Sequence, residues 1–123
     1  MAQRGVEWLI EAHGCDAARL CDVTAIEGLF VALTRAMALN PVDDLVCHRF
    51  PGAGGITAVR LLSESHLACH TFPEHRSICL NLFCCTARPE ANFEALLREH
   101  LGAASITLRR MDRIYETERA AEA

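Results

Sequence analysis

Residues 56–85 read ITAVRLLSESHLACHTFPEHRSICLNLFCC, a stretch of β-forming residues with short polar interruptions. It predicts three consecutive strands, at Ile56–Ser63, His66–Phe72 and Ser77–Cys85. The third strand is apolar on both of its sides, which is typical of a strand that is covered on both faces. The centre of the fold is therefore expected to be a sheet of neighbouring strands.

The flanking segments add helices and further strands to this sheet. One amphipathic helix is expected from Thr24, where Thr24-Ala-Ile-Glu27 has the pattern of a capping box, to about Asn40. A second helix is expected between Pro89 and Gly102. Further strands are predicted at Val6–His13, Leu45–Phe50 and Ile106–Met111. Two helices and a mainly antiparallel sheet predict a single α+β two-layer domain of residues 1–123.

Composition narrows the chemistry that the chain can perform. It has 123 residues, and all 12 of its basic residues are Arg. Because no Lys is present, no side-chain amine can hold pyridoxal phosphate or condense with a substrate, and a P-loop for phosphate binding is excluded as well. Chemistry that condenses with an amine would need an electrophile from another source.

Charge and hydropathy indicate the expected partners and location. The formal net charge is −4 and no basic run occurs, so no nucleic-acid partner is expected. No apolar stretch approaches the ~20 residues of a membrane span, and Glu7 and Glu11 interrupt Met1–Gly14, so neither a membrane nor a signal peptide is expected. A cytoplasmic location is therefore predicted, in which the seven cysteines should be free thiols and mostly buried.

The densest group of polar side chains lies between Ser63 and Glu74. His66 and His70 share one face of a strand and could ligate a metal, but no C-x-x-C or H-E-x-x-H context accompanies them, so no metal is expected. Ser65 and His66 are strand neighbours that should point to opposite faces, which argues against a Ser–His hydrolase dyad. A strand whose polar groups are simply hydrogen-bonded is the alternative for this segment.

Two motifs in this segment resemble the cleavage site of the prokaryotic S-adenosylmethionine decarboxylases. They are Leu61-Leu-Ser-Glu-Ser-His66 and His70-Thr-Phe-Pro-Glu74. The resemblance extends to Gly14-Cys15-Asp16, His48-Arg49-Phe50 and Phe83-Cys84-Cys85, and so covers nearly the whole chain. It implies a self-processing enzyme whose cofactor is a pyruvoyl group made from its own backbone.

The resemblance implies cleavage between Glu64 and Ser65. The Ser65 hydroxyl would attack the Glu64 carbonyl, and β-elimination of the resulting ester would leave the pyruvoyl group at position 65. The products would be a β chain of residues 1–64 and an α chain of residues 65–123. The pyruvoyl group would form a Schiff base with the substrate and accept electrons during decarboxylation, so neither pyridoxal phosphate nor a metal is expected.

The resemblance also carries roles for individual residues. His70 matches the histidine that helps to remove the α-proton of the serine during processing, and Thr57 stands where the family has a serine that supports processing. Cys85 matches the cysteine that returns a proton to the product carbon. Glu74 matches a carboxylate that binds ribose, and Phe50 an aromatic ring that stacks on adenine.

For the fold, the resemblance implies a four-stranded antiparallel sheet with two helices on one face, and a homodimer that forms sheet to sheet. The chain departs from the family at Asn81, where an Asp is usual, and at Glu7, where a His is frequent. These changes leave the substrate open. The first expectation is an S-adenosylmethionine decarboxylase that serves spermidine biosynthesis. An arginine or ornithine decarboxylase on the same scaffold and a non-catalytic binding or regulatory homologue are the alternatives.

Overall fold

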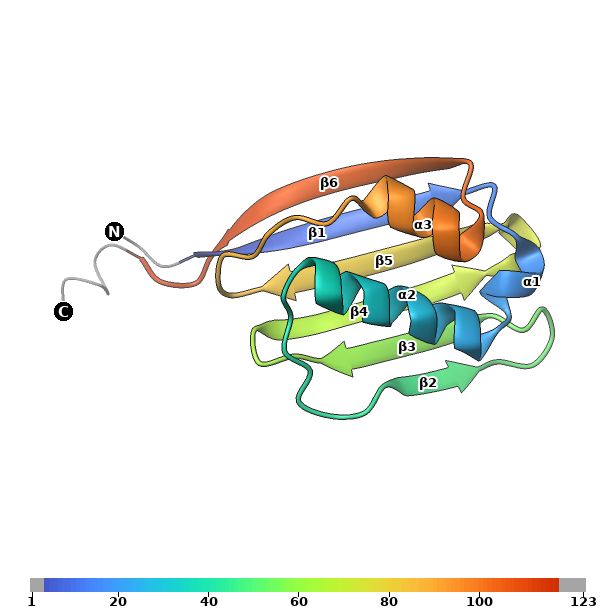
Figure 1. Ribbon diagram of the computed structural model, residues 1–123, viewed down its shortest axis with the longest axis horizontal. Helices are drawn as coiled ribbons and strands as arrows, with labels where there is room; N and C mark the ends of the chain where they lie inside the picture. Colours follow the sequence, from blue (N-terminus) through green and yellow to red (C-terminus); the bar gives the residue numbers. More distant parts are fainter. Residues whose placement is uncertain (1–3, 118–123) are drawn as a thin grey trace.

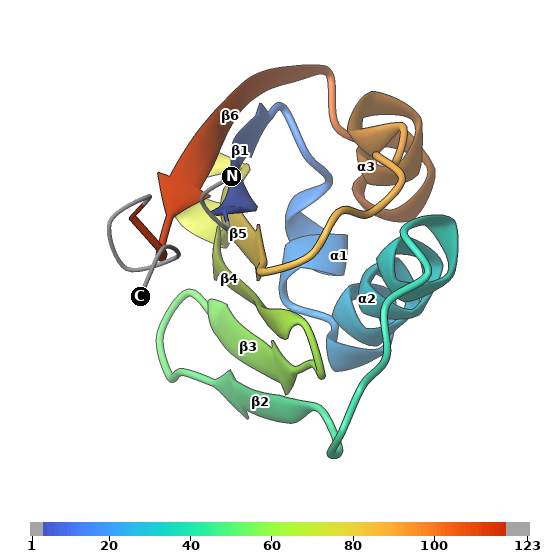
Figure 2. The ribbon, with the colours of Figure 1, turned by 90° about the vertical axis from the view of Figure 1, so that its left-hand side faces the viewer.

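The computed structural model describes residues 4–117, which form a curved antiparallel sheet with helices on one face (Figures 1 and 2). The sheet order is β2-β3-β4-β5-β1-β6, and every neighbouring pair is antiparallel. The strands are β1 (Arg4–His13), β2 (Val46–Arg49), β3 (Ile56–Leu61), β4 (Ser65–Phe72), β5 (Ser77–Cys84) and β6 (Ser105–Ile114).

The α+β class, the antiparallel sheet and each predicted strand are confirmed, but the expected four-stranded sheet is wrong. Within the described residues the sheet has six strands, because both edge segments join it. β2 pairs with β3 from Val46↔Val59 to Arg49↔Ile56. β6 pairs with β1 along its whole length. The edge strands β2 and β6 therefore widen the sheet beyond the expected four.

Two long helices cover one face of the sheet, as predicted, and a short helix precedes the first of them (Figure 2). They are α1 (Ala17–Leu20), α2 (Val23–Ala36) and α3 (Phe93–Leu101), and a 3-10 turn, η1 (Pro73–His75), follows β4. The capping box expected at Thr24 is wrong, because Asp22 caps α2 and accepts a hydrogen bond from the Thr24 N–H at 2.9 Å. Asn92 caps α3, which ends at Gly102 in a left-handed conformation.

The core lies between the sheet and the helices. Trp8 and Ile10 of β1 and Leu29 and Phe30 of α2 are among its buried side chains. Thr71 of β4 is also fully buried; its hydroxyl accepts a hydrogen bond from the Ile56 N–H and donates one to the carbonyl of Leu20, each at 2.8 Å. This side chain links α1 and β3 to β4, so the threonine of the His70–Glu74 motif has a structural role.

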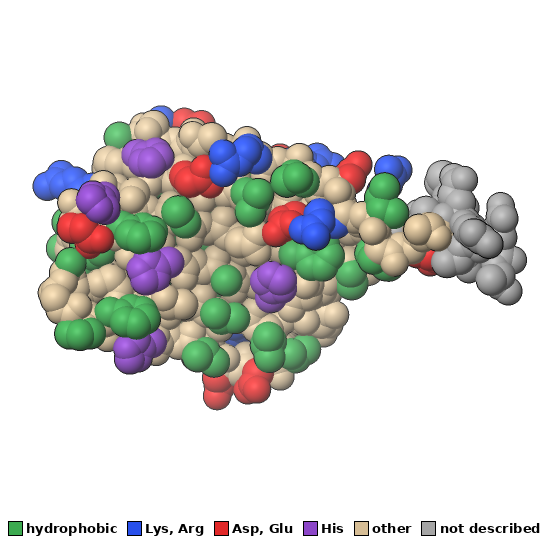
Figure 3. Space-filling model, turned by 180° about the vertical axis from the view of Figure 1, so that it is seen from behind, with side chains coloured by type: hydrophobic (Ala, Val, Ile, Leu, Met, Phe, Trp, Pro, Cys, Tyr) green, Lys and Arg blue, Asp and Glu red, His purple; other side chains and the backbone are tan. Residues whose placement is uncertain are grey.

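The other face of the sheet is free of helices, and Figure 3 shows histidines, hydrophobic side chains and acid–Arg pairs on it. By strand alternation it carries Val46, Leu61 and Met111, whose exposures are 68%, 51% and 49%. Glu11 pairs there with Arg109 at 2.6 Å. An open face with several exposed apolar side chains is typical of an interaction surface.

Candidate active site

The predicted cleavage point lies in the tight turn between β3 and β4. The Leu62 N–H donates to the carbonyl of Ser65 at 2.9 Å, and the Ser63 N–H donates to the carbonyl of Asn40 at 2.8 Å. The Cys85 N–H, at the end of β5, donates to the Glu64 carbonyl at 2.9 Å. The Glu64–Ser65 peptide is therefore held from both flanks, and its carbonyl oxygen already faces an N–H donor.

The side chain of Glu64 is anchored beside this peptide. Only 2% of it is exposed. Its carboxylate accepts hydrogen bonds from the backbone N–H of Asn40 at 2.9 Å and from Asn40 Nδ2 at 2.8 Å, and it lies 3.5 Å from a guanidinium nitrogen of Arg88. Arg88 is fixed in turn, because it donates to the carbonyl of Ala38 at 2.7 Å. Asn40 and Arg88 thus satisfy a buried charge that would otherwise be costly.

Ser65 and His66 contact each other, contrary to the expectation that they point apart. Ser65 Oγ lies 3.1 Å from His66 Nδ1. Ser65 is the first residue of β4 and is still part of the turn that precedes it, so the alternation of strand side chains does not yet apply. On the far side of the ring, His66 Nε2 lies 3.2 Å from Asn81 Oδ1.

Asn81 extends this contact across the sheet. Its Nδ2 donates to Glu7 at 2.6 Å, and Glu7 is paired with Arg113. The hydrogen bond from Asn81, and then the contacts with Arg113, hold the pKa of Glu7 below its ordinary value despite partial burial. A continuous series of polar contacts therefore runs from Ser65 on β4 through β5 and β1 to β6.

The two neighbouring cysteines at the end of β5 differ in environment. Cys84 is fully buried, and burial, with a contribution from Glu64, raises the pKa of its thiol to about 11. Cys85 is partly exposed, and its backbone N–H donates to the Glu64 carbonyl. Of the two, only Cys85 has a thiol that a bound molecule can reach. Gly5 permits this arrangement, because a Cβ there would lie 2.5 Å from the Cys84 carbonyl.

The remaining predicted residues gather at the other end of β4. Thr57 Oγ1 lies 2.6 Å from His70 Nδ1. The ring of His70 is 5.8 Å from that of Phe50 and 4.7 Å from that of Phe72. Glu74 follows in η1 and is exposed. These residues form a second cluster of aromatic and polar side chains.

The single chain does not bring the two clusters together. Ser65 and His70 lie on the same strand five residues apart, so about 16 Å of β4 separates them. Between them the open face has a shallow hollow of about 240 Å³, whose lining includes Leu9, Ala68 and Asn81. Glu64, Ser65 and Cys85 lie together at the turn, whereas Thr57, His70, Phe50 and Glu74 lie beyond this hollow.

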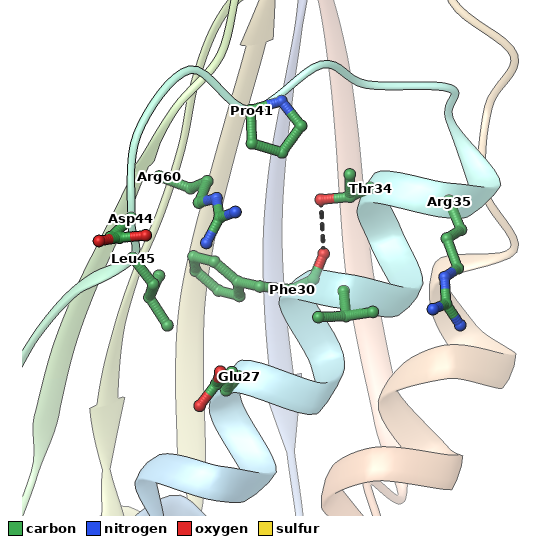
Figure 4. Close-up of a pocket in the computed structure, with 9 residues that line it drawn as sticks. Glu27, Phe30, Thr34, Arg35, Pro41, Asp44, Leu45 and Arg60 are labelled. Carbon is green, nitrogen blue, oxygen red and sulfur yellow. Dashed lines mark hydrogen bonds between the residues drawn. The ribbon is translucent and has the colours of Figure 1, made fainter.

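A second cavity, of about 350 Å³, lies on the helix side of the sheet (Figure 4). Arg60 of β3 and Glu27 and Phe30 of α2 line it, and it contains none of the predicted site residues. The Nε of Arg60 is buried there and makes no hydrogen bond to any described residue.

Within residues 4–117, no group of three or more His, Cys, Asp or Glu has the arrangement of a metal site, and no helix is both long and apolar enough to cross a membrane.

Comparison with known proteins identifies the family. Residues 6–114 match the family model described as S-adenosylmethionine decarboxylase. The chain belongs to the S-adenosylmethionine decarboxylase family. This membership makes it an enzyme of the carboxy-lyase class.

Named members of the S-adenosylmethionine decarboxylase family resemble it over most of its length. It is 32% identical over 111 residues to the S-adenosylmethionine decarboxylase proenzyme of Prochlorococcus marinus, covering 89% of this chain and 86% of that one. It is 37% identical over 93 residues to proenzyme 2 of Halalkalibacterium halodurans, covering 75% and 71%. The crystal structure of the Aquifex aeolicus adenosylmethionine decarboxylase has the same fold, with a TM-score of 0.79, 23% identity and coverage of 96% and 97%.

Sequence reasoning missed several residues of this site. A contact between His66 and Ser65 was not expected, because the side chains of neighbouring strand residues normally point to opposite faces. Asn40 and Arg88 each lie 24 positions from Glu64, one on either side, in loops that no motif marks. Glu7 and Asn81 were noticed only as separate departures from the family pattern. A polar residue on each of two adjacent strands, at positions that share the open face of the sheet, is the signal that could have linked them, since Glu7 and Asn81 are brought together only by strand pairing.

Proposed function

We propose that this chain is a pyruvoyl-dependent S-adenosylmethionine decarboxylase that activates itself by cleavage between Glu64 and Ser65 and serves spermidine biosynthesis. The observation that carries the proposal is the hydrogen bond from the Cys85 N–H to the Glu64 carbonyl, next to the Ser65 hydroxyl. When the hydroxyl attacks that carbonyl, negative charge develops on the oxygen, and an N–H already directed at it stabilises the charge.

The residues around Ser65 fit the formation and use of a pyruvoyl group. The group would supply the electrophile and electron sink that a chain without Lys cannot build from a side chain. Cys85, partly exposed at the same turn, would donate the proton to the product carbon. His70, supported by the Thr57 hydroxyl at 2.6 Å, would help to remove the α-proton of residue 65. Glu74 and Phe50 would bind the ribose and adenine.

The substrate is tested by measuring carbon dioxide release from purified, cleaved protein. We expect turnover of S-adenosylmethionine, with arginine and ornithine unused. Turnover of arginine or ornithine instead would move the assignment to an amino-acid decarboxylase on this scaffold. If cleaved protein releases carbon dioxide from none of the three compounds, the chain is better explained as a non-catalytic binding or regulatory homologue than as a decarboxylase. The cytoplasmic location remains a prediction from the sequence.

We propose that the enzyme is a homodimer that forms sheet to sheet. The open face carries exposed apolar side chains, and about 16 Å of β4 separates Ser65 from His70 within one protomer. In an antiparallel face-to-face dimer, the Ser65 end of one sheet lies over the His70 end of the other. Each complete site would then draw Ser65 and Cys85 from one protomer and His70, Thr57, Phe50 and Glu74 from its partner.

Mixed dimers test this division of the site. We expect Ser65→Ala and His70→Ala proteins to lack activity as homodimers. Differently tagged chains co-expressed and purified as heterodimers should regain up to about half of the wild-type activity, because one of the two sites is complete. Heterodimers that form but stay inactive would contradict a shared site, as would a monomeric active enzyme.

The contacts of Glu64 predict a role for Arg88 in self-cleavage. Arg88→Ala leaves the buried Glu64 carboxylate with Asn40 alone, so the turn should loosen and cleavage slow about tenfold or more. A time course of cleavage in cell-free synthesised protein measures this. Arg88→Lys should recover part of the rate, and Arg98→Ala, which removes only an exposed pair with Glu94, should cleave normally. Cleavage of Arg88→Ala at the wild-type rate would exclude this role.

A further inference from the structure

We infer that His66 is the base that takes the hydroxyl proton of Ser65 during self-cleavage, and that Asn81, Glu7 and Arg113 hold its ring in the tautomer this requires. The inference rests on the proposed self-cleavage and adds to it a residue for its first step. It reverses the sequence-based expectation that Ser65 and His66 cannot act together.

The distances place His66 between the nucleophile and an acceptor. Ser65 Oγ is 3.1 Å from Nδ1 of the ring, and Asn81 Oδ1 is 3.2 Å from its Nε2. His70 does not contact Ser65, since it lies five residues further along the strand and bonds to Thr57 instead. Among the described residues, His66 is therefore the basic side chain that lies within hydrogen-bond distance of the Ser65 hydroxyl.

The contacts beyond the ring decide which nitrogen carries the proton. Glu7 is a carboxylate held ionised by Asn81 and Arg113, so it can only accept. Asn81 must therefore donate to it through Nδ2, which turns the Asn81 carbonyl oxygen toward His66 Nε2. An oxygen at that position requires a hydrogen on Nε2. The Nδ1 lone pair then faces Ser65 Oγ and can accept its proton.

In the first step, the conversion of the peptide bond to an ester, the proton that leaves Ser65 Oγ is taken up and returned by His66. As Ser65 Oγ bonds to the Glu64 carbonyl carbon, its proton passes to His66 Nδ1, and the oxyanion forms against the Cys85 N–H. When the bond between the Glu64 carbon and the Ser65 nitrogen breaks, the same Nδ1 returns the proton to that nitrogen. The products are an ester and a free amine, and no other reactant is consumed. The positive charge on the ring is transient and lies close to Glu7.

Hydroxylamine separates the first step, ester formation, from the second, β-elimination, because it cleaves an ester but not an intact peptide bond. We expect His66→Ala to slow the appearance of ester about a hundredfold or more, so hydroxylamine should release few fragments from it. His66→Asn provides the second variant, because its amide can accept the Ser65 hydrogen bond but cannot take up the proton; it should be equally slow. By contrast, His70→Ala should accumulate ester that hydroxylamine cleaves. His13→Gln, an exposed histidine at the far end of β1, is the matched control.

Asn81 is tested as a positioning residue by two opposite changes. Asn81→Leu keeps the branched shape of the side chain but removes the acceptor for His66 Nε2, and should slow ester formation about tenfold. The double variant Glu7→Gln with Asn81→Asp restores an acceptor at position 81 and a donor at position 7, and should process within about threefold of wild type. A role in packing alone would give the reverse order, with the Leu variant closer to wild type.

The outcomes distinguish this inference from the proposed function. Wild-type protein that never cleaves would overturn both the self-cleavage and the role of His66. Wild-type protein that cleaves, together with folded His66→Ala and His66→Asn that form ester at the same rate, would overturn only the role of His66. Accumulation of ester in the His66 variants would place the histidine in the second step and contradict the inference as well.

Discussion

We expect the Ser65→Ala protein to fold, to stay in one piece and to release no carbon dioxide from any substrate. Alanine lacks the hydroxyl that attacks the Glu64 carbonyl, so neither the ester nor the pyruvoyl group can form. Within residues 4–117 the Ser65 side chain makes no hydrogen bond other than the one to His66, so the substitution leaves the contacts that hold the turn intact. The loss should therefore be complete for both cleavage and activity while the melting temperature changes little.

Denaturing gels and carbon dioxide release measure these two losses. Ser63→Ala is the matched control, because Ser63 is exposed on the same turn and contributes its backbone N–H rather than its side chain. It should cleave and turn over like the wild-type protein. A Ser65→Ala chain that still splits after Glu64 would show that another residue provides the nucleophile, and the account of the cleavage site would then be wrong.

Cys85→Ala is expected to separate cleavage from turnover. The backbone N–H that faces the Glu64 carbonyl is retained, so self-cleavage should proceed at close to the normal rate. Without the thiol, the product carbon loses the proton donor assigned to it, and turnover should fall by about two to four orders of magnitude. Quantified fragments on a gel and carbon dioxide release per cleaved protomer give the two rates.

Cys84→Ala is the control for this comparison. Its thiol is fully buried and has a raised pKa of about 11, so it cannot reach a substrate as a proton donor. Its replacement should lower stability slightly, as a small cavity does, and leave most of the turnover in place. Normal turnover by Cys85→Ala, or a larger loss in Cys84→Ala than in Cys85→Ala, would remove Cys85 from its assigned role.

The strands and helices were largely predictable because their signals are local. The alternating apolar residues of β5 and the apolar stripe of α2 identify both elements without reference to the rest of the chain. Both edge segments were also predicted as strands, but the number of strands that join one sheet was not predictable in this way, and the family resemblance implied only four. β2 has only four residues, and β6 is mostly exposed, so neither carries the strong apolar pattern of a central strand. Their membership of the sheet depends on pairing with β3 and β1.

The site was predictable where it follows the chain and not where it depends on folding. The segment from Glu64 to Glu74 carries its motif in sequence order, so the family resemblance could propose the cleavage point and a role for His70 directly. The contact between Ser65 and His66 depends on the turn before β4, which changes the direction of one side chain. The contacts of Asn40 and Arg88 with Glu64 come from loops distant in sequence, so only the assembled fold brings them to the proposed cleavage point.

The mass of the purified wild-type protein tests the central claim most directly. Self-cleavage predicts two fragments, one of residues 1–64 ending in Glu64 and one of residues 65–123. The second should begin with a pyruvoyl group, so its mass should be lower than that of the same peptide with an amino-terminal serine, and it should resist Edman degradation. A single chain of unmodified mass, found after prolonged incubation of folded protein, would contradict the account.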